Sequence, residues 1–298
     1  MGNLKTALRK AFNEGIVDDK GYVNSYLDNV YCQHMIDEHR KMFEHGSGKE
    51  LQTKARALHS SSMLGYNFFG WIDEAHPFVW KGVKYTKVYF EVQLRTLRCR
   101  SNPANMDIVM DGTKDGHRVL LFIESKFLEY TSSEKFDLSE SYMKKNYYID
   151  SPFDEKAEEL MKLYTEMREQ QKNYYGGVKQ GFCHLVAIKA LSNPKALKWF
   201  NAHNGELKIE DYNGDNILFA NAIFCPNAAE YKSEKGKYEA YKKLYNEFIE
   251  NLPNYFIQPQ WFSYSEIWKE MVPQLLKYGE RDRVDFINRR YMNFAEKC

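Results

Sequence analysis

The sequence predicts an α/β fold in which helices pack against the faces of one mixed sheet. Apolar runs rich in valine, isoleucine, tyrosine and phenylalanine recur along the chain, as in buried strands, and segments of helical periodicity separate them. Hydrophobic residues make up 43% of the 298 positions, which is enough for a sizeable core. The longest apolar runs, such as Val119–Ile123, are far too short to cross a bilayer, so we expect no membrane association.

The N-terminal half is expected to start with helices and to continue into strands. Leucine and phenylalanine side chains recur at helical spacing near the start of the chain, and a Gly-Ser-Gly sequence then interrupts the pattern. A later segment rich in valine, tyrosine and threonine favours a long strand. In order, the expected elements are a helical segment at 1–45, a break at 46–48, a helix at 50–72, a turn at 77–82 and a strand at 84–97.

The C-terminal half is expected to be mostly helical, with one further buried strand. Two adjacent glycines at 176–177 separate a charged amphipathic segment from a more apolar one, and 216–225 is a strongly apolar run. The expected elements are a polar loop or short helix at 128–152, helices at 152–174 and 178–191, a strand at 216–225, and helices at 232–249 and 264–278.

Between these halves, two apolar runs flank the polar turn Thr113–His117 and predict a β-hairpin. Asp107 lies at the start of the first run, and Glu124 and Lys126 lie near the end of the second. In an antiparallel hairpin the start of one strand lies beside the end of the other, and side chains two residues apart share a face. We therefore expect Asp107, Glu124 and Lys126 to converge on one small patch.

Two carboxylates and a lysine held on rigid strands are suited to a divalent-metal site with a cation beside it. Mg²⁺ usually binds to only one or two protein carboxylates and keeps several waters, and it can activate water for phosphodiester hydrolysis. The alternative is that Asp107 caps a strand and that Glu124 and Lys126 form a surface ion pair, which would contribute little to stability.

This constellation resembles the PD-(D/E)xK nuclease superfamily, which has the restriction-endonuclease-like fold. Asp107 matches the aspartate of the motif and Glu124-Ser125-Lys126 matches its E-x-K, whereas Met106 stands where the motif has proline. The flanking segments extend the resemblance. His59–Gly70 is similar to the serine-rich helix that opens one bacterial subgroup, and Val88–Val92 is similar to its first strand.

The resemblance implies an endonuclease that hydrolyses phosphodiester bonds of DNA with Mg²⁺, for which Mn²⁺ is a substitute. Asp107, Glu124 and the backbone carbonyl of Ser125 would hold the metal. Lys126 would orient the attacking water or stabilise charge at phosphorus, and a pKa depressed by the bound metal beside it would let it transfer a proton. Gln180, which opens a helix after the E-x-K strand, resembles the glutamine that follows the core in several such nucleases. It would bind a phosphate or the metal-bound water, or else is an ordinary polar residue at a helix N-terminus.

Three further residues are considered for the site: one has two interpretations, and two are expected to have no catalytic role. Glu91 lies on the strand before the hairpin. It would be a third acid, for a second metal or the water, if its side chain shares the face of Asp107, and otherwise a solvated strand residue. Asp111 is interpreted as a turn residue. His184, one helical turn after Gln180, is expected to pack or to contact a DNA backbone rather than to act in catalysis.

The resemblance covers about residues 51–225, with none recognised in the first fifty residues or the last seventy. It predicts a restriction-endonuclease-like core, with a mixed central sheet flanked by helices and with N- and C-terminal helical additions. We accordingly expect an N-terminal helical extension at 1–50, the nuclease core at 51–230, and a C-terminal helical extension at 231–298 that packs on the core.

The charge and cysteine content restrict the partners only weakly. The net charge is +1, from 42 basic and 41 acidic residues, so double-stranded DNA as a partner follows from the resemblance rather than from composition. Five scattered cysteines without a C-x-x-C pair suit free thiols in a reducing cytoplasm. Basic residues that are candidates for backbone contacts are Lys84, Lys87, Arg95, Arg98, Arg100 and Lys144-Lys145.

Several alternatives stay open from the sequence. A nuclease acting on RNA, or on branched or single-stranded DNA, would use the same motif. A catalytically silent nucleic-acid-binding protein that retains the fold is the alternative from another class, although such a protein has no chemical reason to keep the complete acid and lysine set. A homodimer is also left open.

Overall fold

A computed structural model describes most of the chain, including the whole candidate hairpin. The described residues are 3–12, 17–46, 49–95, 104–131, 133–134, 144, 158, 161–162, 165, 174–175, 178–252, 254 and 256–296.

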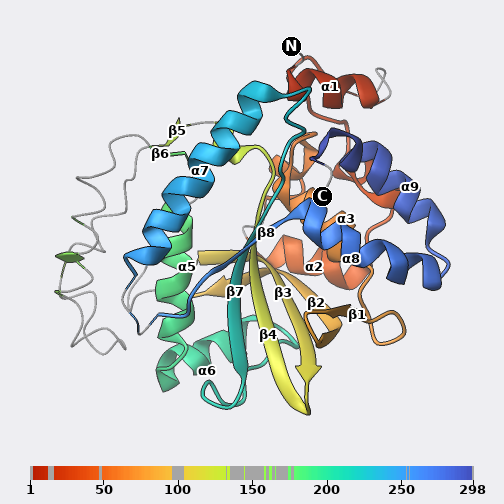
Figure 1. Ribbon diagram of the computed structural model, residues 1–298. Coiled ribbons are helices and arrows are strands. Elements are labelled where there is room, and N and C mark those ends of the chain that lie inside the picture. Colours follow the sequence, from red (N-terminus) through yellow and green to blue (C-terminus); the bar gives the residue numbers. More distant parts are fainter. Residues whose placement is uncertain are drawn as a thin grey trace.

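A six-stranded mixed sheet forms the centre of the protein, with strand order β1-β2-β3-β4-β7-β8 (Figure 1). The strands β1 to β4 pair antiparallel with one another, whereas β7 is parallel to β4 and β8 is parallel to β7. The rings of Trp80 in β1 and Phe262 in β8, at opposite edges, have centroids 4.4 Å apart, so the sheet is strongly curled. The strands are β1 Phe78–Trp80, β2 Val83–Leu94, β3 Ala104–Lys114, β4 His117–Lys126, β7 Asn216–Ile223 and β8 Gln260–Ser263, and a separate pair is β5 Ser133–Glu134 with β6 Tyr174–Tyr175.

Helices cover both faces of this sheet, which confirms the predicted α/β class with a flanked mixed sheet. On one side lie α5, α6 and α7, and on the other lie α2, α3, α8 and α9 (Figure 1). The bounds are α1 Leu4–Ala11, α2 Asp37–His45, α3 Ser61–Phe69, α5 Val178–Ala190, α6 Pro194–His203, α7 Lys232–Glu250, α8 Tyr264–Lys277 and α9 Arg281–Arg290.

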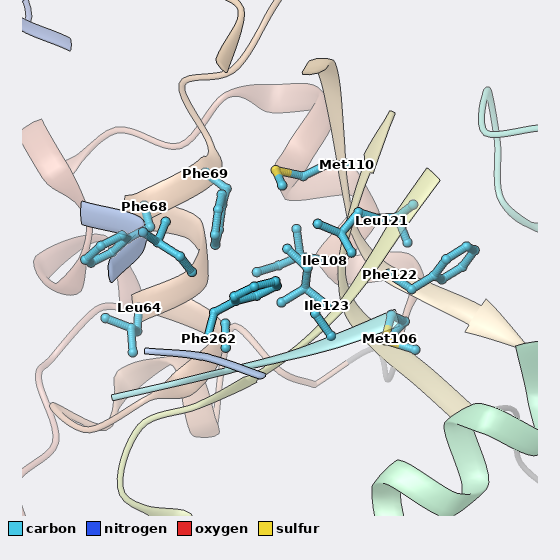
Figure 2. Close-up of a cluster of buried hydrophobic side chains, with 14 of the residues drawn as sticks. Leu64, Phe68, Phe69, Met106, Ile108, Met110, Leu121, Phe122, Ile123 and Phe262 are labelled. Carbon is cyan, nitrogen blue, oxygen red and sulfur yellow. The ribbon is translucent and has the colours of Figure 1, made fainter. Parts of the chain in front are cut away.

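The core between α3 and the sheet follows from side-chain alternation along the hairpin strands. Ile108 and Ile123 lie opposite each other across β3 and β4 and are fully buried, and the close-up shows them facing Phe69 of α3 (Figure 2). The next residue, Phe122, points away from α3 to the other side of the sheet (Figure 2). Because successive side chains alternate, the residues of opposite parity, Asp107 and Glu124 among them, belong to the α5 face.

The described elements agree with the sequence expectations where hydrophobic patterns are long. The hairpin, the strands at 84–97 and 216–225, and the helices at 178–191, 232–249 and 264–278 are all present within a few residues of their predicted bounds. The expected helix at 152–174 and most of the loop at 128–152 lie outside the described residues. The division into units at 1–50, 51–230 and 231–298 stays a prediction.

Four expectations were wrong in detail. Residues 1–45 are not continuously helical, because short 3₁₀ turns at Tyr26–Asn29 and Tyr31–Gln33 separate α1 from α2. The helix expected at 50–72 starts only at Ser61, where Ser60 caps it by accepting a hydrogen bond from the Met63 backbone N–H. The turn at 77–82 contains the edge strand β1, and the C-terminal segment supplies β8 as well as helices. These strands have three and four residues, too few to show an alternation pattern.

The helices and the cysteines give two further observations. Within the part of the chain that the structure covers, no helix combines the length and the apolar character needed to cross a membrane. The three cysteines in that part, Cys32, Cys183 and Cys225, form no disulfide.

His39 of α2 makes the stability of this fold depend on pH. Its ring is 7% exposed and packs edge-on against Phe90 and Tyr66, and Nδ1 has no hydrogen-bond partner. Burial lowers the pKa of His39 from 6.5 to about 4. Because the folded pKa lies below the unfolded value, the unfolded chain binds a proton first as the pH falls. The stabilisation is therefore complete above pH 6.5 and is lost as the pH falls toward 4.

His39→Leu should remove this dependence. Denaturant unfolding at pH 7 and pH 4 should show the wild type losing about 3 kcal/mol more than the variant over that interval, from about 1.36 kcal/mol per pKa unit. The same substitution at the exposed His34 is the matched control and should leave the pH dependence as in the wild type. Equal losses in wild type and His39→Leu would contradict this role of His39.

Candidate active site

The hairpin turn sets the register that places the acids. Asp115 and Gly116 have φ of +51° and +81°, as a two-residue type I′ turn requires, and Asp-Gly is a preferred sequence for it. Lys114 then pairs with His117, and Ile108 with Ile123. Continuing this register by one residue places Asp107 directly opposite Glu124.

The β2–β3 register adds Glu91 to the same row. Phe90 pairs with Ile108 and Val92 with Met106, so Glu91 lies opposite Asp107. Directly opposite residues share a face of the sheet. Glu91, Asp107 and Glu124 consequently lie side by side across three neighbouring strands, and all three line one cavity of about 710 Å³.

Asp107 is oriented by the backbone of the facing strand. The backbone pairing between β3 and β4 ends at Ile108 and Ile123. Just beyond this pair, the Ser125 backbone N–H donates a hydrogen bond to Asp107 Oδ2 at 2.7 Å. Ser125 itself is fully buried, and its hydroxyl donates to the Ser61 backbone carbonyl at the start of α3. The position of the Asp107 carboxylate is therefore coupled to the packing of α3 against β4.

Lys126 lies in the interior rather than on the surface. Its Nζ donates to Glu124 Oε1 and to Gln180 Oε1, both at 2.5 Å. Glu124 and Lys126 are 1% and 4% exposed, so the alternative of a solvated surface ion pair is excluded. Gln180, at the start of α5, contacts the site through Lys126, a partner that the sequence did not indicate, and its expected contact with a phosphate or the metal-bound water stays a prediction.

His184 contacts the same carboxylate from the next turn of α5. Its Nδ1 lies 3.3 Å from Glu124 Oε2, and its ring packs edge-on against Phe219 of β7. Both Glu124 Oε2 and His184 Nδ1 are buried and lack a hydrogen-bond partner within the described chain. The spacing of α5 predicts that His184 shares the face of Gln180, but the facing residue Glu124 cannot be identified from the local sequence, so packing or DNA contact was the expectation for His184.

Glu91 is held in an unusual backbone conformation. Its φ is +50°, a region that non-glycine residues seldom occupy. Asn105 Nδ2 donates to Glu91 Oε2 at 3.3 Å. Gly46, after α2, lies so close that a Cβ there would come within 2.6 Å of the Glu91 Cβ, so only glycine fits. Glu91 is 7% exposed and is not the solvated strand residue of the alternative interpretation.

The electrostatics of the site show an excess of negative charge. Burial and then the charge of Glu124 raise the pKa of Asp107 well above its usual value. Burial, followed by Glu50 and Glu124, raises the pKa of Glu91 to about 8. Burial lowers the pKa of Lys126, but Glu124 and neighbouring carboxylates outweigh it and raise the pKa above the usual value. Without a metal, Lys126 is therefore held as a cation, and the depressed pKa expected of a lysine beside a bound metal stays a prediction.

This donor set fits a hydrated magnesium ion better than a metal enclosed by protein ligands. Among the described residues there is no group of three or more histidine, cysteine, aspartate or glutamate side chains placed to hold a metal ion. Two neighbouring carboxylates remain, and Glu124 Oε2 accepts no hydrogen bond within the described chain. One or two carboxylates with several waters is the usual protein coordination of Mg²⁺. Asp107 and Glu124 thus meet that requirement, and Glu91 lies beside them.

The structure also locates other charged residues near the site and on the sheet. Asp111 forms a two-point ion pair with Arg118, at 2.6 and 3.0 Å, and is not simply a turn residue. Lys5 and Lys54, which the sequence analysis did not select, line the cavity with the acids. The basic candidate Arg95 lies over the Trp199 ring, while Arg98, Arg100 and Lys145 are outside the described residues.

Comparison with known families gives one match. A family model described as Restriction Endonuclease associating with ARP matches residues 3–201. The matched region contains β1 to β4, the start of α5 and each of the acids, the lysine and the histidine described above, and it includes the first fifty residues, where no resemblance was recognised from the motifs. No curated protein and no solved structure matches the chain.

Proposed function

The chain belongs to the family described as Restriction Endonuclease associating with ARP, and from that premise we propose that it is a Mg²⁺-dependent endonuclease that hydrolyses phosphodiester bonds of DNA. The family description names restriction endonucleases, which supports DNA as the substrate. We keep double-stranded DNA as the proposed partner and the cytoplasm as the proposed location.

One observation supports this proposal most strongly. The carboxylates of Asp107 and Glu124 lie opposite each other at the end of a hairpin, with Lys126 bonded to one of them, in a cavity of about 710 Å³. Burying such a cluster is costly unless the charges are matched by ligands. An intact set of two acids and a lysine, kept buried at that cost, is explained by chemistry more readily than by stability.

Each side chain has a distinct role in the proposed reaction. Asp107 and Glu124 would hold Mg²⁺, which when bound supplies an activated water and charge stabilisation at the scissile phosphate. Ser125 fixes Asp107 through its backbone N–H. Lys126 is protonated and presents its ammonium group to the negative charge that develops on the phosphate oxygens. Gln180 accepts a hydrogen bond from Lys126 and holds that ammonium group in place.

The test is a cleavage assay on supercoiled plasmid, single-stranded DNA and RNA, with Mg²⁺ and with a chelator. Chelator-sensitive nicking or linearisation of plasmid is the expected result. Cleavage restricted to RNA or single-stranded DNA would select the alternative nuclease, and binding without any cleavage would select the silent nucleic-acid-binding protein. The Asp107→Asn protein, purified in parallel, identifies a contaminating nuclease.

Glu91→Gln should reduce activity less than changes at Asp107 or Glu124. Glutamine keeps an acceptor for Asn105 but removes a potential negative charge beside Asp107. A neighbour of the metal ligands orients them or the water, and its loss typically costs about 10- to 100-fold. Calcium titration should show weaker binding, and single-turnover rates at saturating Mg²⁺ should fall. Unchanged affinity together with an unchanged rate would leave a site of two carboxylates and one lysine.

A further inference from the structure

Two buried hydroxyl groups link the C-terminal helix α8 to the candidate active site. The hydroxyl oxygens of Tyr264 and Ser125 lie 2.6 Å apart, and Ser125 Oγ donates to the Ser61 backbone carbonyl at 2.9 Å. Each hydroxyl group has one proton to donate. Because Ser125 uses its proton on Ser61, the Tyr264 O–H donates to Ser125 Oγ. Tyr264 and Ser125 are both fully buried, so bulk water does not compete for these two hydrogen bonds.

The Tyr264 hydroxyl is fixed in place by the backbone and the ring of its residue. Ser263, the preceding residue, pairs with β7 in the sheet and caps α8 by accepting a hydrogen bond from the Glu266 backbone N–H. The Tyr264 ring packs edge-on against Phe68 of α3, with ring centroids 4.7 Å apart. A tyrosine held in this way gives Ser125 a hydrogen-bond donor of fixed position.

The backbone of Ser125 carries this constraint to a carboxylate of the site. The hydroxyl of Ser125 faces α3, whereas its backbone N–H donates to Asp107 Oδ2 at 2.7 Å. The contact with α3 is close, because a Cβ added at Gly65 would lie 2.7 Å from a side-chain carbon of Ile108 and 3.5 Å from Ser125 Oγ. A displacement of the serine side chain would therefore also move the N–H that orients Asp107.

We propose that Tyr264 is a positioning residue of the active site, which acts through Ser125 on the Asp107 carboxylate. This proposal rests on the proposed function, since Asp107 is one of the two carboxylates assigned to the metal. Tyr264 lies outside the E-x-K motif and outside the matched residues 3–201. The C-terminal segment thus completes the site as well as covering the core.

Tyr264→Phe tests this role, because it removes the hydroxyl and leaves the ring in place. Calorimetric titration of CaCl₂ into the full-length protein should show an affinity about tenfold below that of the wild type, the lower end of the usual cost of losing a group that orients metal ligands. The single-turnover cleavage rate at saturating Mg²⁺ should fall by a similar factor. The calcium titration does not depend on cleavage and so tests Tyr264 separately from the reaction.

Tyr291→Phe is the matched control. Tyr291 is 1% exposed, and its hydroxyl accepts a hydrogen bond from Asn67 Nδ2 at 2.8 Å, so this variant also loses one buried hydrogen bond. Both variants should lower the midpoint of denaturant unfolding to a similar extent. Tyr291→Phe should nevertheless keep its Ca²⁺ affinity and its cleavage rate within about twofold of the wild type, because no ligand is oriented through Asn67.

A double-mutant cycle with Ser125→Ala tests the route by which Tyr264 acts. Alanine removes Ser125 Oγ and keeps the backbone N–H that bonds Asp107. If Tyr264 acts through Ser125 Oγ, Tyr264→Phe should cause no further loss of Ca²⁺ affinity or of rate in the Ser125→Ala protein. Independent packing effects would instead add.

The outcomes separate this proposal from the proposed function. Wild-type affinity and rate in Tyr264→Phe, equal losses in Tyr264→Phe and Tyr291→Phe, or additive losses with Ser125→Ala would overturn the positioning role and leave the metal site intact. A wild-type protein that neither binds Ca²⁺ nor cleaves any of the nucleic acids would overturn the proposed function, and the role of Tyr264 with it.

Discussion

Replacement of Glu124 by glutamine, or of Asp107 by asparagine, should abolish metal-dependent cleavage. Each change removes one of the two carboxylates that face each other across β3 and β4, and each keeps the size and the hydrogen-bonding shape of the side chain. Losing a ligand of the catalytic ion should reduce the single-turnover rate by about a thousandfold or more, which corresponds to about 4 kcal/mol of transition-state stabilisation.

The fold should survive these substitutions. Asp107 lies beside Glu124, and burial together with that charge raises its pKa, so a neutral side chain there relieves unfavourable interactions. Thermal unfolding without metal should show Asp107→Asn at least as stable as the wild type. Calcium should raise the melting temperature of the wild type and not of the variants, because a ligand stabilises only the state that binds it.

Asp111→Asn provides the matched control for these variants. Asp111 is on the same strand as Asp107, but it pairs with Arg118 and is outside the cavity. This variant should cleave like the wild type even though it loses an ion pair. Full activity in Asp107→Asn, or a comparable loss in Asp111→Asn, would place the active site elsewhere.

Lys126→Met should have the second large effect, on stability as well as on rate. Lys126 is 4% exposed, and its ammonium group is hydrogen-bonded to Glu124 and Gln180. Removing one partner of a buried ion pair leaves the other charge uncompensated, which typically costs about 3–5 kcal/mol. The cleavage rate should fall by about 10²–10³, the usual cost of losing a charge-stabilising group, and metal affinity should change much less than the rate.

A double-mutant cycle tests the physical cause of this effect. In the protein with both Lys126→Met and Glu124→Gln, neither charge is left unpaired, so much of the lost stability should return. Denaturant unfolding of the four proteins at one pH gives the coupling between the two residues. Additive losses, with the double variant less stable than either single one, would show that the lysine acts through packing alone.

The sequence by itself determined the parts of this site that depend on local pattern. The Asp-Gly turn and the alternation of apolar side chains define a two-stranded hairpin, and from its register Asp107, Glu124 and Lys126 must share a face and an end. The long amphipathic patterns of α7 and α8 were equally readable, since a helix of several turns repeats its apolar stripe.

Local sequence patterns could not predict which distant segments pair as strands, or in which register. Glu91 joins the row only because β2 pairs with β3 in one register, and a slip by one residue would turn its side chain to the other face. The edge strand β8 has four residues and gains its place from parallel pairing with β7. Its partners lie 40 positions earlier in the chain, as in the pair Ile223 with Ser263, so no local pattern indicates the pairing.

The tertiary structure alone decided the environment of the acids. Burial of Lys126, and with it the raised rather than depressed pKa, comes from α5 and from surrounding carboxylates that are far apart in sequence. The same helix places His184 against Glu124, 60 residues away along the chain. Spacing within α5 shows that Gln180 and His184 share a face, but only packing against β4 determines which charge that face meets, because burial and electrostatic coupling arise from through-space contacts.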